Sequence, residues 1–200
     1  MKKLLYLFLT CLLLAGCRGN RYYLDKVEAL WSVDYDSVMD CLQKVDSASM
    51  ISDEWLDYHY FRMRASFGYL MSMEKNQVDS IIRVFKEHYP MGHERAFDSR
   101  LLEVVYTYNR LNEYRKVDSL LGILKSYALL PKDSSRWYSY KYQTKWRLDE
   151  KDSSLHYIQE AIRLGLWKGS FAHERQAYVY QTMGQPDSAI ASYLEAMEQD

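Results

Sequence analysis

Apolar residues recur three and four positions apart along most of the chain, the spacing that is typical of amphipathic helices. The segments DSLLGILKSY (118–127) and DSAIASYLEAM (187–197) are examples. No run of strand length alternates apolar and polar residues between hairpin turns, and the chain contains three prolines. The pattern therefore predicts an all-α fold.

A recurring Asp-Ser pair opens successive helical stretches. The pairs follow one another after 43, 39, 34 and 35 residues, which is the range expected for stacked helical hairpins. We expect each Asp to cap the helix that it opens, by accepting hydrogen bonds from the unpaired amides of the first turn. The five pairs are Asp36-Ser37, Asp79-Ser80, Asp118-Ser119, Asp152-Ser153 and Asp187-Ser188.

A second helical stretch, rich in aromatic residues, precedes each pair, and a short polar or glycine-containing turn separates the two. The predicted fold class is therefore an α-solenoid of about five antiparallel helix pairs, spanning residues 22–200. A repeat array of this kind builds an extended surface and no single catalytic pocket. The preceding stretches are residues 22–32, 53–73, 95–111, 135–148 and 171–183.

The first seventeen residues, MKKLLYLFLTCLLLAGC, have the layout of an export signal. The apolar run is shorter than the roughly 20 residues that span a membrane. Leu14-Ala15-Gly16-Cys17 resembles the lipobox of bacterial lipoproteins. The resemblance implies removal of residues 1–16 and a membrane anchor of acyl chains such as palmitate on Cys17, followed by a short tether over residues 17–21.

Charge and cysteine content narrow the class of partner. The formal net charge of −1 becomes −3 when the two lysines of the signal are removed, so the chain lacks the concentrated basic surface that nucleic acid requires. Cys11 leaves with the signal and Cys17 is the expected lipid site. Cys41 is then the remaining thiol, and we expect it to be a small buried apolar residue.

The last unit has small residues at Ala177 and Ala189 and a glycine, Gly184, at its turn. It resembles a tetratricopeptide repeat, in which small residues stand where two helices cross closely and a glycine stands at the turn. The fourth unit matches at Ser154 and Ala161, whereas earlier units have bulky residues there, so the resemblance is strongest over residues 95–200. With the lipobox, the chain resembles the tetratricopeptide-type lipoproteins common in Bacteroidota. The matching residues of the last unit are Ala177, Ala189, Ala196, Tyr180, Tyr193 and Gly184.

In that family the first helix of each unit lines a concave groove. The resemblance therefore implies a mixed stripe of amides, aromatics and charged groups suited to an extended peptide. Lys141 and Lys145 occupy inward positions in the strict register, which means either a helix shifted by one residue or lysine stems that extend past the core. The groove positions are Asn109, Asn112, Arg136, Gln143, Trp146, Glu174, Tyr178 and Gln181.

Residues for catalysis or cofactor binding are not found in any recognisable pattern. His93-Glu94 and His173-Glu174 begin like a zinc-protease helix, but Phe97 and Ala177 replace the second histidine. No nucleophile elbow or glycine-rich phosphate loop is present. We therefore expect no enzyme, no metal site and no cofactor.

The sequence favours a non-catalytic, lipid-anchored protein of the bacterial envelope that binds protein or peptide in a helical-repeat groove. By resemblance to other bacterial lipoproteins, Arg18 in place of an aspartate after Cys17 implies the outer membrane, and the lack of an acidic run there favours its periplasmic face. The alternatives are a sensory repeat region of a signalling system and a glycan-uptake lipoprotein. No polar capping helix follows Ile190 and Leu194, so either the array continues in a partner or by self-association, or the chain is a shortened form of a longer protein.

Overall fold

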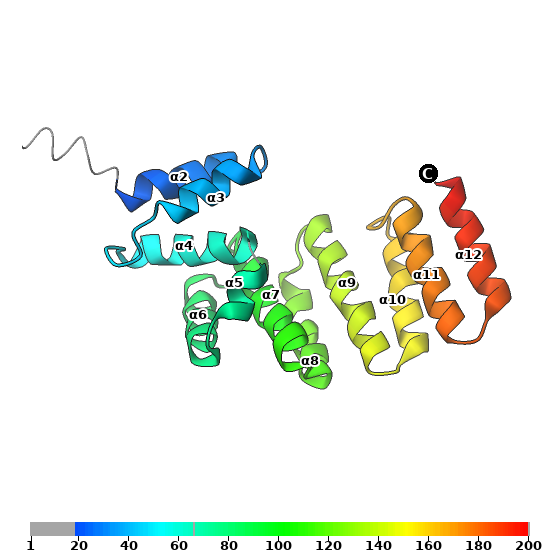
Figure 1. Cartoon of the computed structure of the whole chain (residues 1–200). Helices are drawn as coiled ribbons and strands as arrows, with labels where there is room; N and C mark the ends of the chain where they lie inside the picture. Colours follow the sequence, from blue (N-terminus) through cyan, green and yellow to red (C-terminus); the bar gives the residue numbers. More distant parts are fainter. Residues whose placement is uncertain (1–18, 66, 200) are drawn as a thin grey trace, which may run out of the picture. The chain divides into compact units, whose positions relative to one another are not determined.

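The computed structural model describes residues 19–65 and 67–199, and helices are the only regular elements within these ranges (Figure 1). The expected signal and Cys17 lie outside them. The described residues form two compact units, which divide after Ile81. The first contains α2 (Asn20–Leu30), α3 (Tyr35–Gln43), α4 (Ser52–Ala65), α5 (Phe67–Ser72) and the first half of α6 (Lys75–His88).

The second unit begins within α6 and contains three further helix pairs. Its helices are α7 (Ala96–Tyr106) with the π-helical turn η1 (Thr107–Leu111), α8 (Tyr114–Leu124) with the 3₁₀ turn η2 (Lys125–Tyr127), α9 (Pro131–Arg147), α10 (Lys151–Arg163), α11 (Ser170–Thr182) and α12 (Pro186–Glu198). All the helices predicted from the apolar pattern are present, and the all-α prediction is confirmed.

In the first unit, α2 packs against α3 and α4, with Leu24 and Val27 fully buried. The helix begins at Asn20, so residues 20 and 21 belong to the fold rather than to the expected tether. The reason is that the Asn20 side chain holds the loop after α3. Its Nδ2 donates to the Asp46 carbonyl at 3.0 Å and its Oδ1 accepts from the Asp46 amide at 2.8 Å. Cys41 is buried, as predicted.

The same unit holds a neutral histidine. His59 lies against the Trp55 ring, and its Nδ1 is 2.6 Å from the Tyr69 hydroxyl. Burial lowers the pKa of His59 to about 4, with a further contribution from the Arg62 charge, and burial raises the pKa of Tyr69 to about 12. At neutral pH the imidazole is therefore uncharged and the Tyr69 hydroxyl keeps its proton, so the hydrogen bond joins two neutral groups.

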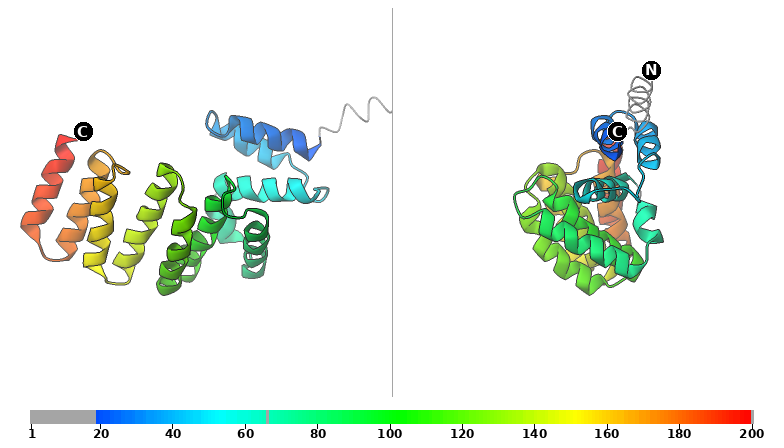
Figure 2. Two further views of the ribbon diagram at one scale, coloured as in Figure 1. Left: turned by 180° about the vertical axis from the view of Figure 1, so that it is seen from behind. Right: turned by 90° about the vertical axis from the view of Figure 1, so that its left-hand side faces the viewer.

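In the second unit α9, α10, α11 and α12 lie side by side with alternating directions, as Figure 1 and the left view of Figure 2 show. Two apolar clusters form the core. The first, around Trp137, joins α7, α8 and α9, and the second, around Ile158, joins α9, α10 and α11. The Trp137 indole also donates to the Leu121 carbonyl at 2.7 Å.

The small residues predicted at helix crossings are buried. Ala177, Ala189 and Ala196 lie between α11 and α12, where side chains longer than a methyl group would push the helices apart. Ser154 and Ala161 of α10 have no exposed surface, and the Ser154 hydroxyl donates to the Tyr142 carbonyl of α9 at 3.0 Å. The register assigned to the last two repeats is thereby supported.

Three successive turns inside the helix pairs share one backbone conformation. Asn112, Asp149 and Gly184 have φ angles of 56°, 61° and 73°, and each stands two residues before the next helix. Glycine adopts this left-handed conformation without strain, and Asn and Asp tolerate it better than other residues. Asn112 and Asp149 therefore do in the earlier repeats what Gly184 does in the last.

The predicted capping role of the five Asp-Ser aspartates is wrong. Asp79 and Asp118 lie at the fifth residue of α6 and α8, and Asp36, Asp152 and Asp187 lie at the second residue of their helices. The side-chain cap that begins α3 is Asp34, which accepts from the Ser37 amide at 3.2 Å. The helices begin earlier than the sequence motif, so Asp36, Asp152 and Asp187 stand in the first turn of their helices and Asp79 and Asp118 stand in the second.

Lys141 and Lys145 do point inward, and a carboxylate accounts for their burial. Asp118 of α8 accepts from Lys141 Nζ at 2.6 Å and from Lys145 Nζ at 3.0 Å, and Lys145 also reaches Glu150 at 2.8 Å. Burial raises the pKa of Asp118, but the two lysine hydrogen bonds outweigh it and leave that pKa below its usual value. The third Asp-Ser pair thus links two neighbouring helix pairs.

Within the described ranges no helix has the length and apolar character needed to cross a bilayer.

Candidate binding surface

A hollow of about 300 Å³ lies between α9 and α11 in the second unit. Trp146 and Tyr178, from the two first helices of successive pairs, stand on it with ring centroids 5.8 Å apart. Both side chains retain exposed surface, and Tyr178 is 45% exposed. We refer to this feature as the α9–α11 hollow. Its walls are completed by Tyr108, Tyr142, Gln143, Phe171 and Val179.

Two arginines stand at the α9–α11 hollow without a carboxylate partner among the described residues. Arg147 Nε donates to the Tyr108 hydroxyl at 3.4 Å, and its guanidinium lies 5.2 Å from the Trp146 ring centroid. Arg175 lies 4.8 Å from the Phe171 ring centroid. Burial raises the pKa of Tyr142, so the hydroxyl facing this surface stays protonated at neutral pH.

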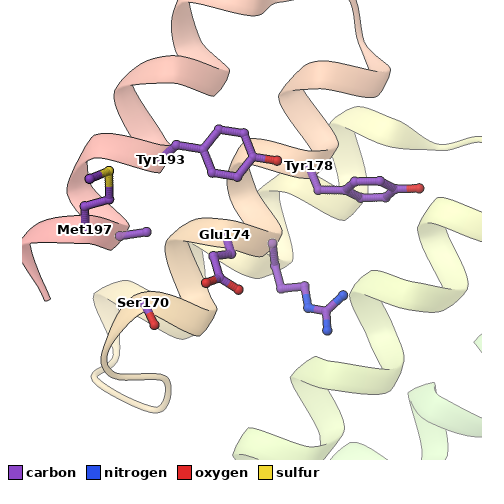
Figure 3. Close-up of a pocket in the computed structure, with 7 residues that line it drawn as sticks. Ser170, Glu174, Tyr178, Tyr193 and Met197 are labelled. Atoms are coloured by element: carbon purple, nitrogen blue, oxygen red, sulfur yellow. The ribbon is translucent and has the colours of Figure 1, made fainter. Parts of the chain in front are cut away.

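A second hollow of about 570 Å³ adjoins the first, between α11 and α12. Figure 3 shows Glu174 and Tyr178 of α11 opposite Tyr193 and Met197 of α12, with Ser170 at one end. Tyr178 and Arg175 line both hollows, so the two surfaces are continuous. We refer to this feature as the α11–α12 hollow.

Four of the eight predicted groove residues meet on this surface. Gln143, Trp146 and Tyr178 line the α9–α11 hollow, and Glu174 and Tyr178 line the α11–α12 hollow. The Gln143 amide donates to Ser139 Oγ at 3.1 Å, which leaves its oxygen free to accept a hydrogen bond from a ligand.

The other four predicted groove residues lie elsewhere. Asn112 forms the left-handed turn and accepts from the Tyr114 hydroxyl at 2.9 Å. The amide of Asn109, in η1, donates to the Val105 carbonyl of α7 at 2.9 Å. Arg136 pairs with Asp98 of α7. Gln181 is exposed near the end of α11 and lines neither hollow.

The sequence reasoning missed both arginines. Arg147 lies four residues after Gln143, and Arg175 lies four residues after Phe171 and three before Tyr178. Residues at these spacings share one face of a helix. The helical period therefore contained the signal, but the family's strict groove positions exclude both residues.

The exposed apolar flank expected on the last helix is present. Ile190 and Leu194 are 58% and 56% exposed, and Met197 is 75% exposed. A third hollow, of about 370 Å³, lies among Leu129, Leu130 and Leu164 at the turns between pairs. Lys125 is the only charged residue that lines it among the described residues, and most of the other residues that line it are apolar.

No family model matches the chain, and no curated protein matches it. A search of solved structures finds a chain titled MamA MSR-1 C2, with a TM-score of 0.53 and 18% sequence identity. The match covers 90% of this chain and 96% of that one. MamA is a tetratricopeptide-like helical-repeat protein. At this identity the likeness shows the fold alone, which is an all-α, tetratricopeptide-like helical repeat.

In the described ranges no group of three or more His, Cys, Asp or Glu side chains is arranged to hold a metal ion. The chemistry that the surface offers is aromatic contact, hydrogen bonding by one amide and several hydroxyls, two guanidinium charges and the carboxylate of Glu174.

Proposed function

We propose that the protein is a non-catalytic, lipid-anchored scaffold of the bacterial envelope that binds an extended peptide segment of a partner protein across the α9–α11 and α11–α12 hollows. The observation that carries the proposal is the continuous surface around Tyr178, where Trp146, Tyr178 and Tyr193 present partly exposed rings. Aromatic side chains with polar edges are preferred anchors of recognition surfaces. The helical-repeat fold supports a role in protein binding in general.

Replacing the two central rings is expected to weaken binding. In Trp146→Ala, Tyr178→Ala, peptides selected from a random synthetic library on the detergent-purified full chain should bind at least about tenfold more weakly, because aromatic anchors dominate such interfaces. Fluorescence anisotropy measures the affinity. The matched control is Leu129→Ala, Leu164→Ala, which removes exposed apolar groups from the third hollow and should leave affinity unchanged.

Both variants should melt within a few degrees of the parent chain, which separates loss of contact from loss of fold. Equal affinity of the aromatic variant and the parent would remove the binding surface from the proposal. Binding to members of a glycan panel, with no binding to any library peptide, would favour the alternative of a glycan-uptake lipoprotein.

The anchor part of the proposal depends on Cys17. Dual acyl signals give stable membrane attachment, so the parent chain should sediment with membranes. Cys17→Ser should remove labelled palmitate from the protein and release it from the membrane fraction. Label retained by the serine variant would contradict lipidation at this residue. Sucrose-gradient separation of inner and outer membranes tests the proposed outer-membrane location, and protease protection in intact cells tests the periplasmic face.

A further inference from the structure

The positive charge of the α9–α11 hollow indicates which class of peptide would bind there. This inference rests on the proposed function. Arg136, Lys141 and Lys145 of α9 are each matched by a carboxylate of this chain. Arg147, on the same helix, is not, and neither is Arg175 of α11. Within the described part of the chain, no Asp or Glu oxygen lies within 4.0 Å of either guanidinium.

Both guanidinium groups are held in place by aromatic rings rather than by anions. Arg147 rests between the Trp146 ring and the Tyr114 ring, at 5.2 and 5.9 Å from their centroids, and Arg175 rests on the Phe171 ring. Stacking on a ring leaves the N–H edges of a guanidinium available to hydrogen-bond an anion. The guanidinium groups of Arg147 and Arg175 are therefore oriented by the rings and available to bind an anion.

Among the described residues, no acidic side chain lines the α9–α11 hollow. Glu174 lines the α11–α12 hollow and not the α9–α11 hollow. Glu195 of α12 lies 3.0 Å from His173, and Glu150 is bound to Lys145. A second guanidinium charge near the first favours an anion in the occupant more strongly than one charge would.

We infer that the α9–α11 hollow selects an acidic peptide segment, in which side-chain carboxylates of Asp or Glu bind Arg147 and Arg175 while a neighbouring apolar or aromatic side chain packs on Trp146 and Tyr178. Charge-assisted hydrogen bonds from arginine to carboxylate are about twice as strong as neutral ones. Repulsion between like charges at the same two arginines disfavours binding of basic segments.

The test compares synthetic peptides that alternate Glu with Phe and Gln with Phe, each with a free and an amidated C-terminus, against the full chain. The Glu peptide should bind at least about tenfold more tightly than the Gln peptide, and the preference should shrink as salt rises. Arg147→Gln, Arg175→Gln should abolish the preference. The control Arg115→Gln, Arg163→Gln removes the same charge from exposed positions on α8 and α10 and should keep it.

Affinity could instead depend on the free C-terminus and be equal for the Glu and Gln peptides. The bound carboxylate would then be the end of the peptide, and this result would overturn selection of acidic side chains. Equal affinity for all four peptides, with binding still lost in Trp146→Ala, Tyr178→Ala, would overturn the inference and leave the proposed function standing. Absence of binding by every peptide, selected library peptides included, would overturn both.

Discussion

Asp118→Ala is expected to lower the free energy of unfolding of the second unit by about 2–4 kcal/mol at neutral pH. The substitution leaves Lys141 and Lys145, whose side chains are 10% and 14% exposed, without their shared carboxylate. Removing one partner of a buried ion pair typically costs about 3–5 kcal/mol, and the 27% exposure of Asp118 reduces this. Urea denaturation followed by circular dichroism measures the change.

The effect should depend on pH in a defined direction. The pKa of Asp118 is lowered in the folded chain, so its contribution is complete above the unfolded value of about 3.9 and is lost as pH falls through the folded pKa. The pKa of Lys145 is raised, because its hydrogen bonds to Glu150 and Asp118 outweigh the opposing effect of burial. Its contribution is complete below about 10.4 and is lost as pH rises through the folded pKa.

A double-mutant cycle isolates this interaction. Asp118→Ala and Lys141→Met should be coupled by more than about 1 kcal/mol, because the second change removes a charge that the first leaves unpaired. The control is Asp152→Ala, which removes an exposed Asp-Ser aspartate from the first turn of α10 and should cost below about 1 kcal/mol. Additive single effects would contradict the proposed link between the helix pairs.

The Asp-Ser motif shows where sequence reasoning succeeds and where it stops. Its spacing predicted the helix pairs and their number in the described chain well, because apolar periodicity is a local property. The role of each aspartate depends on where its helix begins and on what lies opposite. Asp118 meets lysines that follow it by 23 and 27 residues, and no local pattern contains that contact.

The candidate site was predictable to a similar degree. Family positions placed Gln143, Trp146, Glu174 and Tyr178 on the surface that the structure forms. They also included Asn112, whose left-handed backbone assigns it to a turn, and they excluded Arg147 and Arg175. Helical spacing brings these arginines onto the same faces, but their lack of carboxylate partners is a tertiary property that a sequence does not contain.

Trp137→Ala is expected to destabilise the second unit by about 3–5 kcal/mol, as large truncations in a packed core do. Trp137 is 3% exposed and contacts the cluster formed by α7, α8 and α9, including Phe97, Leu121 and Leu124. Its indole N–H also satisfies the Leu121 carbonyl. Trp137→Phe keeps a ring in the cluster and loses that hydrogen bond, so it should cost about 1–2 kcal/mol.

Trp146 provides the matched comparison, since it lies on the same helix but at the surface of the α9–α11 hollow. Trp146→Ala should change the urea midpoint much less than Trp137→Ala does, while it weakens peptide binding. Trp137→Phe should lower the urea midpoint and leave the affinity for peptide unchanged. A Trp146→Ala variant as unstable as Trp137→Ala would mean that this ring is a core residue, and the surface around Tyr178 would then lose its main anchor.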